Sequence, residues 1–337
     1  MAKKDILENL KETPPRAYND HILVIDAMNM LIRSFSLLKA MNPDGTHIGG
    51  IVGFLRSLGY VTRIFDPTRV IVVWDGKGGS GNRKNINPEY KAHRATARIT
   101  HWGLYDTKEQ EMEALIGQLF RIQEYLECLP IVQVTMDKLE ADDIIAYIAT
   151  NTNKKVTIVS SDKDFLQLIN KNVEVYAPVK KKTYTKDNVQ EEIKVLPENY
   201  NIVKALLGDH SDGIRGVKGL GIKTIVSEWK SFCYDPGASL QDIFDHCETQ
   251  MELDKPKKIF SKILHEWERV MNNFEIMDLH NTSLDEKEIE TLKESIQTQV
   301  SKTQIGAFLQ YLDNDNIEGI TKNTVGWLDN FRGLIVK

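Results

Sequence analysis

The sequence predicts an α/β fold in which helices flank a mainly parallel central sheet, followed by a helical region. Three short apolar runs, at 21–30, 69–76 and 154–164, each end in acidic residues, and 131–134 is a fourth strand candidate. Continuous apolar runs of this kind are typical of strands that are covered on both faces, as in a parallel sheet. Amphipathic segments lie between these runs, so strands and helices alternate over about 20–180.

Each element follows from its local pattern. Residues 1–20 are polar, contain a Pro-Pro pair and are expected to form a flexible arm. Apolar positions at helical spacing predict helices at 52–65, 112–129 and 141–150. After about residue 195 the pattern becomes mostly helical, with further helices expected at 257–279 and 301–312. We therefore expect an α/β domain over 21–195 and a helical region over 196–337.

Composition excludes several classes of protein. The 337 residues are 41% hydrophobic, and 43 Lys and Arg face 48 Asp and Glu, a net charge of −5. These values exclude a disordered chain and a uniformly basic binder. Three cysteines without a CxxC pair indicate a reducing compartment and no disulfide scaffold. Without a signal peptide or an apolar run of about 20 residues, we expect a cytoplasmic protein with no membrane partner.

One segment, 76–103, interrupts the alternation. It has no apolar stripe, and from Lys77 to Arg98 six basic residues face Glu89 alone, a local charge of +5. A loop this long in a compact domain is usually functional or disordered. The basic insertion is suited to gripping a nucleic acid strand, with Tyr90 and Trp102 stacking on bases. The alternative is a solvated basic loop whose aromatics pack at its base.

Acidic residues gather where the predicted strands end. Ligands of such sheets bind beyond the carboxyl ends of the strands, so we expect these acids to converge. Like charges so close would be protonated unless cations were bound, and sites made only of oxygen suit Mg²⁺ or Mn²⁺. No set of Cys and His residues has the spacing of a zinc site, which would be the competing kind of metal site. The acids are Asp26, Asp75, Glu140, Asp142, Asp143, Asp162, Asp164, Asp209 and Asp212.

Two alternatives stand beside the metal site. Any one of these acids alone could be a helix N-cap or a turn residue. The SDKD sequence at 161–164 also fits the DxD site of a sugar transferase or an aspartyl-phosphate enzyme. The recurrence of acids at every strand end favours the cation site.

The segment 208–229 is a glycine-rich turn between two predicted helices. Glycines allow close approach of the backbone to a phosphate, and a helix that opens at Lys223-Thr224 offers free N–H groups. Such a turn, with Arg215 and Lys218 beside it, is suited to binding the sugar-phosphate backbone without reading bases. The order of residues fits neither a Walker A loop nor a dinucleotide-binding fingerprint. A purely structural helix hairpin is the alternative.

Taken together, five motifs in one order resemble the 5′-nuclease, or flap endonuclease, superfamily. They are LVIDAMNM (23–30), VVWDG (72–76), LEADD (139–143), VSSDKDF (159–165) and GDHSDGIRGVKGLGIKT (208–224). The resemblance covers about 20–230, and 171–186 and the EYKAHR element (89–94) are similar to phage-type RNase H. It implies a PIN/5′-nuclease-like sheet, a helical arch over the site, a helix–three-turn–helix motif that grips duplex DNA, and two divalent metals. No motif aligns after residue 230.

The resemblance also assigns roles to individual residues. It implies that Asp26, Asp75, Glu140 and Asp142 serve a first Mg²⁺, and that Asp164, Asp209 and Asp212 serve a second, with Asp143 and Asp162 nearby and Asp162 shared. Lys91 and Arg94 match the arch element and would act on the scissile phosphate. The turn 213–221 could hold a K⁺ through backbone carbonyls. The expected DNA-binding residues are Arg33, Arg83, Lys84, Tyr90, Arg215, Lys218, Gly219, Gly221, Lys223 and Thr224.

The function implied is a metal-dependent, structure-specific 5′ nuclease, a 5′–3′ exonuclease and flap endonuclease on DNA, with Mn²⁺ able to replace Mg²⁺. RNA primers in RNA/DNA hybrids at replication forks are a further candidate substrate. A single-strand-binding protein or a sliding clamp are candidate partners, and a monomer is expected, in the host cytoplasm if the gene is a phage's. The alternatives are a non-catalytic branched-DNA-binding protein and a PIN-like ribonuclease.

Overall fold

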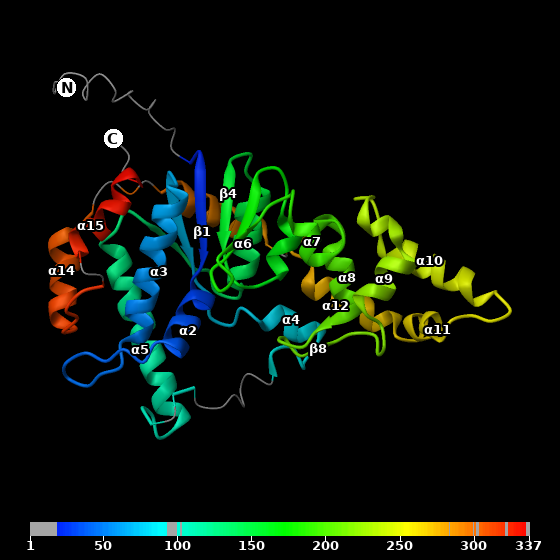
Figure 1. Cartoon of the computed structure of the whole chain (residues 1–337), viewed down its shortest axis with the longest axis horizontal. Coiled ribbons are helices and arrows are strands. Elements are labelled where there is room, and N and C mark those ends of the chain that lie inside the picture. Colours follow the sequence, from blue (N-terminus) through cyan, green and yellow to red (C-terminus); the bar gives the residue numbers. More distant parts are fainter. Residues whose placement is uncertain are drawn as a thin grey trace, which may run out of the picture.

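A six-stranded sheet forms the centre of the α/β part of the chain (Figure 1). The computed structural model describes residues 19–92, 100–101, 103–282, 284–298, 300, 303–320 and 323–334. The strand order is β3-β2-β1-β4-β5-β6; the first five strands run parallel and β6 pairs antiparallel with β5. The strands are β1 (His21–Asp26), β2 (Arg69–Val73), β3 (Val132–Val134), β4 (Lys155–Val159), β5 (Val173–Ala177) and β6 (Lys182–Tyr184).

The central strand explains the continuous apolar runs. In β1, Val24 pairs with Ile71 of β2 on one side and with Ile158 of β4 on the other. Leu23 and Ile25 belong to the core on one face of the sheet, and Ile22 and Val24 belong to the core on the opposite face. Because both faces are covered, the four residues between His21 and Asp26 are all apolar and buried. The four predicted strands and the mainly parallel sheet are confirmed.

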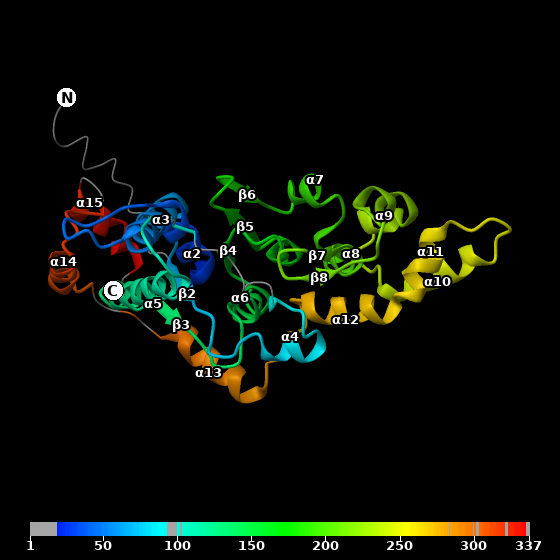
Figure 2. The same cartoon turned by 90° about the horizontal axis from the view of Figure 1, so that it is seen from below.

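Helices cover the two faces of the sheet. On one face lie α2 (Ala27–Leu37), α3 (Gly49–Phe65) and α5 (Lys108–Glu127), and on the other lies α6 (Ala141–Thr150) (Figures 1 and 2). These helices confirm the predictions for 52–65, 112–129 and 141–150 to within a few residues. Periodicity did not predict the hairpin of β5 and β6, which falls in the stretch 171–186 that is similar to phage-type RNase H.

The last helices of the chain return to the α/β unit. They are α14 (Ile305–Asn314), α15 (Thr324–Leu328) and the 3₁₀ helix η5 (Asp329–Leu334). The N–H of Gln304 donates to the carbonyl of Cys128 over 2.8 Å, and Trp327 packs on Gly59 of α3. A Cβ on Gly59 would lie 2.0 Å from Nε1 of Trp327, so the helix and the indole meet only because this residue is glycine.

The remaining helices extend from the sheet to an elongated arm: α13 (Glu286–Gln297) packs against β3, and α9, α10 and α11 form the arm. In Figure 2, α9, α10 and α11 lie at the end of the molecule opposite α14 and α15. The segment predicted as one helix at 257–279 is divided at Glu266, which leaves helical geometry with φ −100° and ψ 15°. The elements are α7 (Val189–Ile193), η3 (Pro197–Asn199), α8 (Tyr200–Leu207), α9 (Ile222–Glu228), η4 (Lys230–Cys233), α10 (Leu240–Met251), α11 (Lys258–His265), α12 (Trp267–Met277) and α13 (Glu286–Gln297).

Two predicted motifs are seen in part. Within the basic insertion the structure describes one short helix, α4 (Gly81–Ile86); Arg94 and Trp102 lie outside the described residues. The helical arch therefore stays a prediction. Helices α8 and α9 flank the glycine-rich turn, which contains a two-stranded ribbon of β7 (Gly208–Asp209) and β8 (Ile214–Arg215). Among the described residues, no helix combines the length and apolarity needed to cross a membrane.

Candidate active site

A cavity of about 650 Å³ opens at the carboxyl ends of β1, β2 and β4, where the sheet topology places the acidic residues. The start of α6, parts of α2 and α5, and Lys91 and Thr100 of the basic insertion also line it. Six of the predicted site residues line it: Asp26, Arg33, Asp75, Lys91, Asp142 and Asp162. Four of the predicted acids thus meet at this edge of the sheet, and the roles predicted for all six residues stay predictions.

Asp26 both caps a helix and lines the cavity. Its Oδ1 accepts the N–H of Asn29 over 3.0 Å and caps α2, while its Oδ2 accepts the hydroxyl of Ser160 over 2.8 Å. It is 7% exposed. Burial raises the pKa of Asp26 to about 7, and the charges of Asp75 and Asp162 add to the increase. The cap residue is thus also part of the charged cavity.

The start of α6 brings a second group of acids to the cavity. Oδ1 of Asp75 accepts the N–H of Ala141 over 2.8 Å, which fixes the end of β2 to this helix. Asp142 stands in the first turn of α6. Burial raises the pKa of Asp142 well above its ordinary value, and the charge of Asp162 raises it further. These carboxylates therefore repel one another across the cavity.

Beside the cavity, three donors surround Glu140. Nη1 of Arg83 donates to Oε2 over 2.6 Å, the hydroxyl of Tyr90 to the same oxygen over 2.9 Å, and Nζ of Lys91 to Oε1 over 2.8 Å. Arg83 also makes a bidentate pair with Asp143, at 2.7 and 3.0 Å. Arg83 and Tyr90 were predicted to bind DNA; here their polar atoms contact acidic side chains and anchor the insertion to α6.

Lys91 connects the insertion to the glycine-rich turn. Its N–H donates to the carbonyl of Asp212 over 2.8 Å. Its φ of 53° places it in the left-handed region, which is costly for a residue with a Cβ. Fixed in this way, the ammonium lines the cavity and reaches Glu140. The neighbouring acids Asp142 and Glu140 raise the pKa of Lys91 despite its burial.

A third group lies around Lys204 of α8, a residue that was not among the predicted site residues. Its ammonium forms ion pairs with both Asp164 and Asp209, and its side chain is 11% exposed. Burial and the charge of Asp162 raise the pKa of Asp164 to about 7. One feature of the sequence could have pointed to Lys204. It stands five residues before Asp209, on a helix that carries mostly apolar residues at its other buried positions.

Eight of the nine predicted metal ligands therefore form three adjacent groups rather than one, and the ninth, Asp212, is linked to the site through its carbonyl, which accepts the N–H of Lys91. Asp26, Asp75, Asp142 and Asp162 line the cavity; Glu140 and Asp143 pair with Arg83; Asp164 and Asp209 pair with Lys204. In the part of the chain that is described, no three Asp, Glu, His or Cys side chains are already arranged to hold a metal ion. Instead, the positively charged side chains of Arg83, Lys91 and Lys204 lie among the acids.

The predicted DNA-binding residues of the turn are mostly exposed. Arg215, Lys218 and Lys223 of the turn are exposed, as is Lys84 of the basic insertion, and Arg215 makes a surface ion pair with Glu89 at 3.4 Å. Gly219 has a φ of 88°, which only glycine adopts readily, and Gly221 is the N-cap of α9, where its carbonyl accepts the N–H of Thr224 over 2.9 Å. Arg33 lies instead at the cavity, where burial lowers its pKa.

Comparison with known proteins agrees with this architecture. The family described as "5′-3′ exonuclease, N-terminal resolvase-like domain" matches residues 21–194. This chain belongs to the 5′–3′ exonuclease family. The resemblance is confirmed, and since an exonuclease is a phosphodiester hydrolase, so is the expected class of enzyme.

Relatives and solved structures extend the comparison. The 5′-3′ exonuclease of Bacillus subtilis is 32% identical over 217 residues, 61% of this chain and 68% of that protein. The 5′-3′ exonuclease of Aquifex aeolicus is 30% identical over 242 residues, 70% of this chain and 77% of that protein. The flap endonuclease of bacteriophage T5, solved with DNA and metal ions, superposes with a TM-score of 0.61 at 21% identity, covering 88% of this chain and 99% of that one. This likeness confirms the fold.

Proposed function

We propose that this chain is a divalent-metal-dependent, structure-specific 5′ nuclease that hydrolyses phosphodiester bonds of DNA at 5′ ends and flaps. The observation that carries the proposal is the cavity in which carboxylates from β1, β2, α6 and the end of β4 meet the ammonium of Lys91. The flap endonuclease of bacteriophage T5, solved with both DNA and metal ions, supports the same chemistry.

The chemistry of the acids fits divalent cations. Asp26 and Asp142 have raised pKa values because they are buried beside further carboxylates, and a bound cation would remove this repulsion. In the proposed assignment, Asp26, Asp75, Glu140 and Asp142 would hold one Mg²⁺ and Asp164, Asp209 and Asp212 a second, with Asp143 and Asp162 beside them. When bound, such ions generate a water nucleophile and stabilise the charge of the leaving oxygen.

Other residues of the chain would position the substrate. Lys91 would contact the scissile phosphate, because its ammonium is fixed at the cavity by Glu140 and by its own backbone. Arg83 would act through Glu140 and Asp143, which it holds on α6. Lys218 and Lys223 would contact the phosphates of the duplex without selecting its sequence.

The test is product mapping on a 5′-flap DNA substrate with MgCl₂ or with EDTA. We expect cleavage only with the metal, and we expect Asp142→Ala and Asp162→Ala to abolish it while duplex binding is kept. Asp187→Ala, which removes an exposed acid far from the cavity in sequence, is the charge-matched control. Full activity of either cavity variant would defeat the proposal, and DNA binding without cleavage by the unmodified chain would indicate a non-catalytic binder.

The same assay addresses the choice of substrate. An RNA-tipped flap and an all-DNA flap of one sequence, compared at equal concentration, test the proposed removal of RNA primers. Cleavage restricted to RNA would instead favour a ribonuclease. Duplex binding measured in KCl and in NaCl tests the K⁺ proposed for the turn 213–221; equal affinity in the two salts would remove that ion from the assignment.

A further inference from the structure

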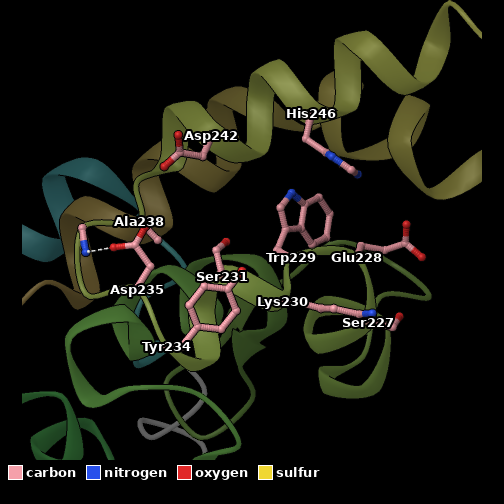
Figure 3. Close-up of a pocket in the computed structure, with 11 residues that line it drawn as sticks. Ser227, Glu228, Trp229, Lys230, Ser231, Tyr234, Asp235, Ala238, Asp242 and His246 are labelled. Atoms are coloured by element: carbon pink, nitrogen blue, oxygen red, sulfur yellow. Dashed lines mark hydrogen bonds between the residues drawn. The ribbon is translucent and has the colours of Figure 1, made fainter.

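A second cavity, of about 570 Å³, opens between the end of α9, η4 and the start of α10 (Figure 3). It shares no lining residue with the candidate active site. Its lining is acidic, since it contains the carboxylates of Glu228, Asp235 and Asp242 and one lysine, Lys230, while Glu228 is also paired with Lys257 outside the lining. An acidic cavity on a protein that is proposed to bind nucleic acid needs an explanation other than DNA.

The wall of this cavity contains buried polar atoms without partners. Trp229 is 4% exposed and meets the ring of His246 edge-on, with centroids 5.3 Å apart. Nε1 of Trp229 and Nε2 of His246 are both buried, and neither has a hydrogen-bond partner among the described residues. A buried indole N–H normally finds an acceptor. The wall of the cavity therefore contains an indole N–H without an acceptor, and a ligand that displaces the atoms covering it could satisfy this donor.

The carboxylates are held in place but only partly engaged. Oδ1 of Asp235 accepts the N–H of Gly237 over 2.9 Å, and Oδ2 of Asp242 accepts from Ser239 in the capping box of α10. Oε1 of Glu228 pairs with Lys257. Among the described residues these bonds engage one oxygen of each carboxylate, so a second oxygen of each is left to accept from a ligand.

We propose that this cavity binds a short peptide segment rich in Arg and Lys that a protein partner presents. Guanidinium and ammonium groups would donate to the carboxylates, and Tyr234, 72% exposed at the rim, offers an aromatic face for the cation. A peptide carbonyl would accept from Trp229. The volume suits a ligand larger than one guanidinium.

The charge and the place of the cavity argue against DNA as the occupant. Phosphates would be repelled by three carboxylates, and the lysines proposed to meet the duplex lie toward the other end of α9. That helix has seven residues, about 10 Å. A partner docked in the cavity would therefore stand beside the bound duplex without competing for it.

The experiment uses the full chain in EDTA, so its result does not depend on the proposed nuclease activity. Fluorescence anisotropy is measured with a labelled Gly-Arg-Lys-Arg-Gly peptide and with a Gly-Glu-Asp-Glu-Gly control. We expect only the basic peptide to bind. The double variant Asp235→Asn with Asp242→Asn should weaken this binding about tenfold. Asp245→Asn, the same kind of charge change elsewhere on α10, should leave it within about twofold.

Three results would overturn the proposal. The first is that the basic peptide does not bind. The second is that the double variant and Asp245→Asn lose peptide affinity equally. The third is that free arginine amide binds as tightly as the peptide. Trp229→Phe separates a specific contact from a general attraction, because it keeps an aromatic ring and removes the N–H. It should weaken peptide binding and leave duplex binding unchanged; a loss of duplex binding instead would assign the cavity to the DNA surface.

Discussion

Lys204 offers the sharpest test of how the acidic site is balanced. Its ammonium pairs with Asp164 and Asp209, and its side chain is 11% exposed. Lys204→Met keeps the apolar stem and removes the charge, which leaves two carboxylates facing each other. Breaking a buried ion pair by removing one partner costs about 3–5 kcal/mol. Because this lysine keeps slight exposure, we expect the lower end, a loss of about 3 kcal/mol in the metal-free protein.

The assay is denaturant unfolding followed by circular dichroism, in EDTA and in MgCl₂. Since a divalent cation would replace the lost charge, the variant should regain more stability on adding Mg²⁺ than the unmodified chain does. Lys163→Met is the control: its side chain is 56% exposed and pairs with Glu192 at 3.2 Å, so its loss should cost less than about 1 kcal/mol. If Lys204→Met had the same free energy of unfolding in EDTA as the unmodified chain, the reasoning that the acids need the charge of Lys204 would be refuted.

Three further predictions concern the insertion, the core and the surface. Glu111 accepts the backbone N–H groups at 100 and 101 over 2.8–2.9 Å; Glu111→Gln should speed amide exchange at those two residues about tenfold, and unchanged exchange would contradict the anchor. Gly59→Ala should destabilise the fold by about 1–3 kcal/mol in denaturant unfolding, because its Cβ would overlap Trp327; a gain in stability would show that the indole yields. The hydrogen bond from Lys180 lowers the pKa of Glu192 to about 2, below its unfolded value of 4.5. Glu192 therefore stabilises the fold above about pH 4.5 and loses this effect as the pH falls toward 2, so the difference in unfolding free energy from Glu192→Gln should shrink over that range; a constant difference would refute the assignment.

The sheet and the cavity could be predicted because both depend on local rules. Strands covered on both faces are apolar throughout, so each ends visibly at an acid such as Asp26 or Asp162, and parallel strands bring those ends to one edge. The convergence of four acids at the cavity follows directly.

The distribution of positive charge could not be predicted in the same way. Arg83 lies in a basic insertion that was expected to face DNA, and only the folded chain brings its guanidinium to Glu140 and Asp143. Lys204 lies on a buried helix, and the sequence around it does not show that its ion-pair partners are Asp164, 40 residues before it, and Asp209, five residues after it. Such long-range pairing is a property of tertiary structure. A pattern of residue types shows which charges exist, and it does not show which of them meet.

The return of the last helices to α3 and α5 has a consequence for biosynthesis. Phe308, Trp327 and Phe331 are buried in the same core as the residues of α3. During translation, that apolar surface stays uncovered until the residues of α14, α15 and η5 have left the ribosome. The core around α3 therefore closes only after these much later helices have been made, so a nascent chain truncated before α14 would expose a hydrophobic face and become a target for chaperones or proteases.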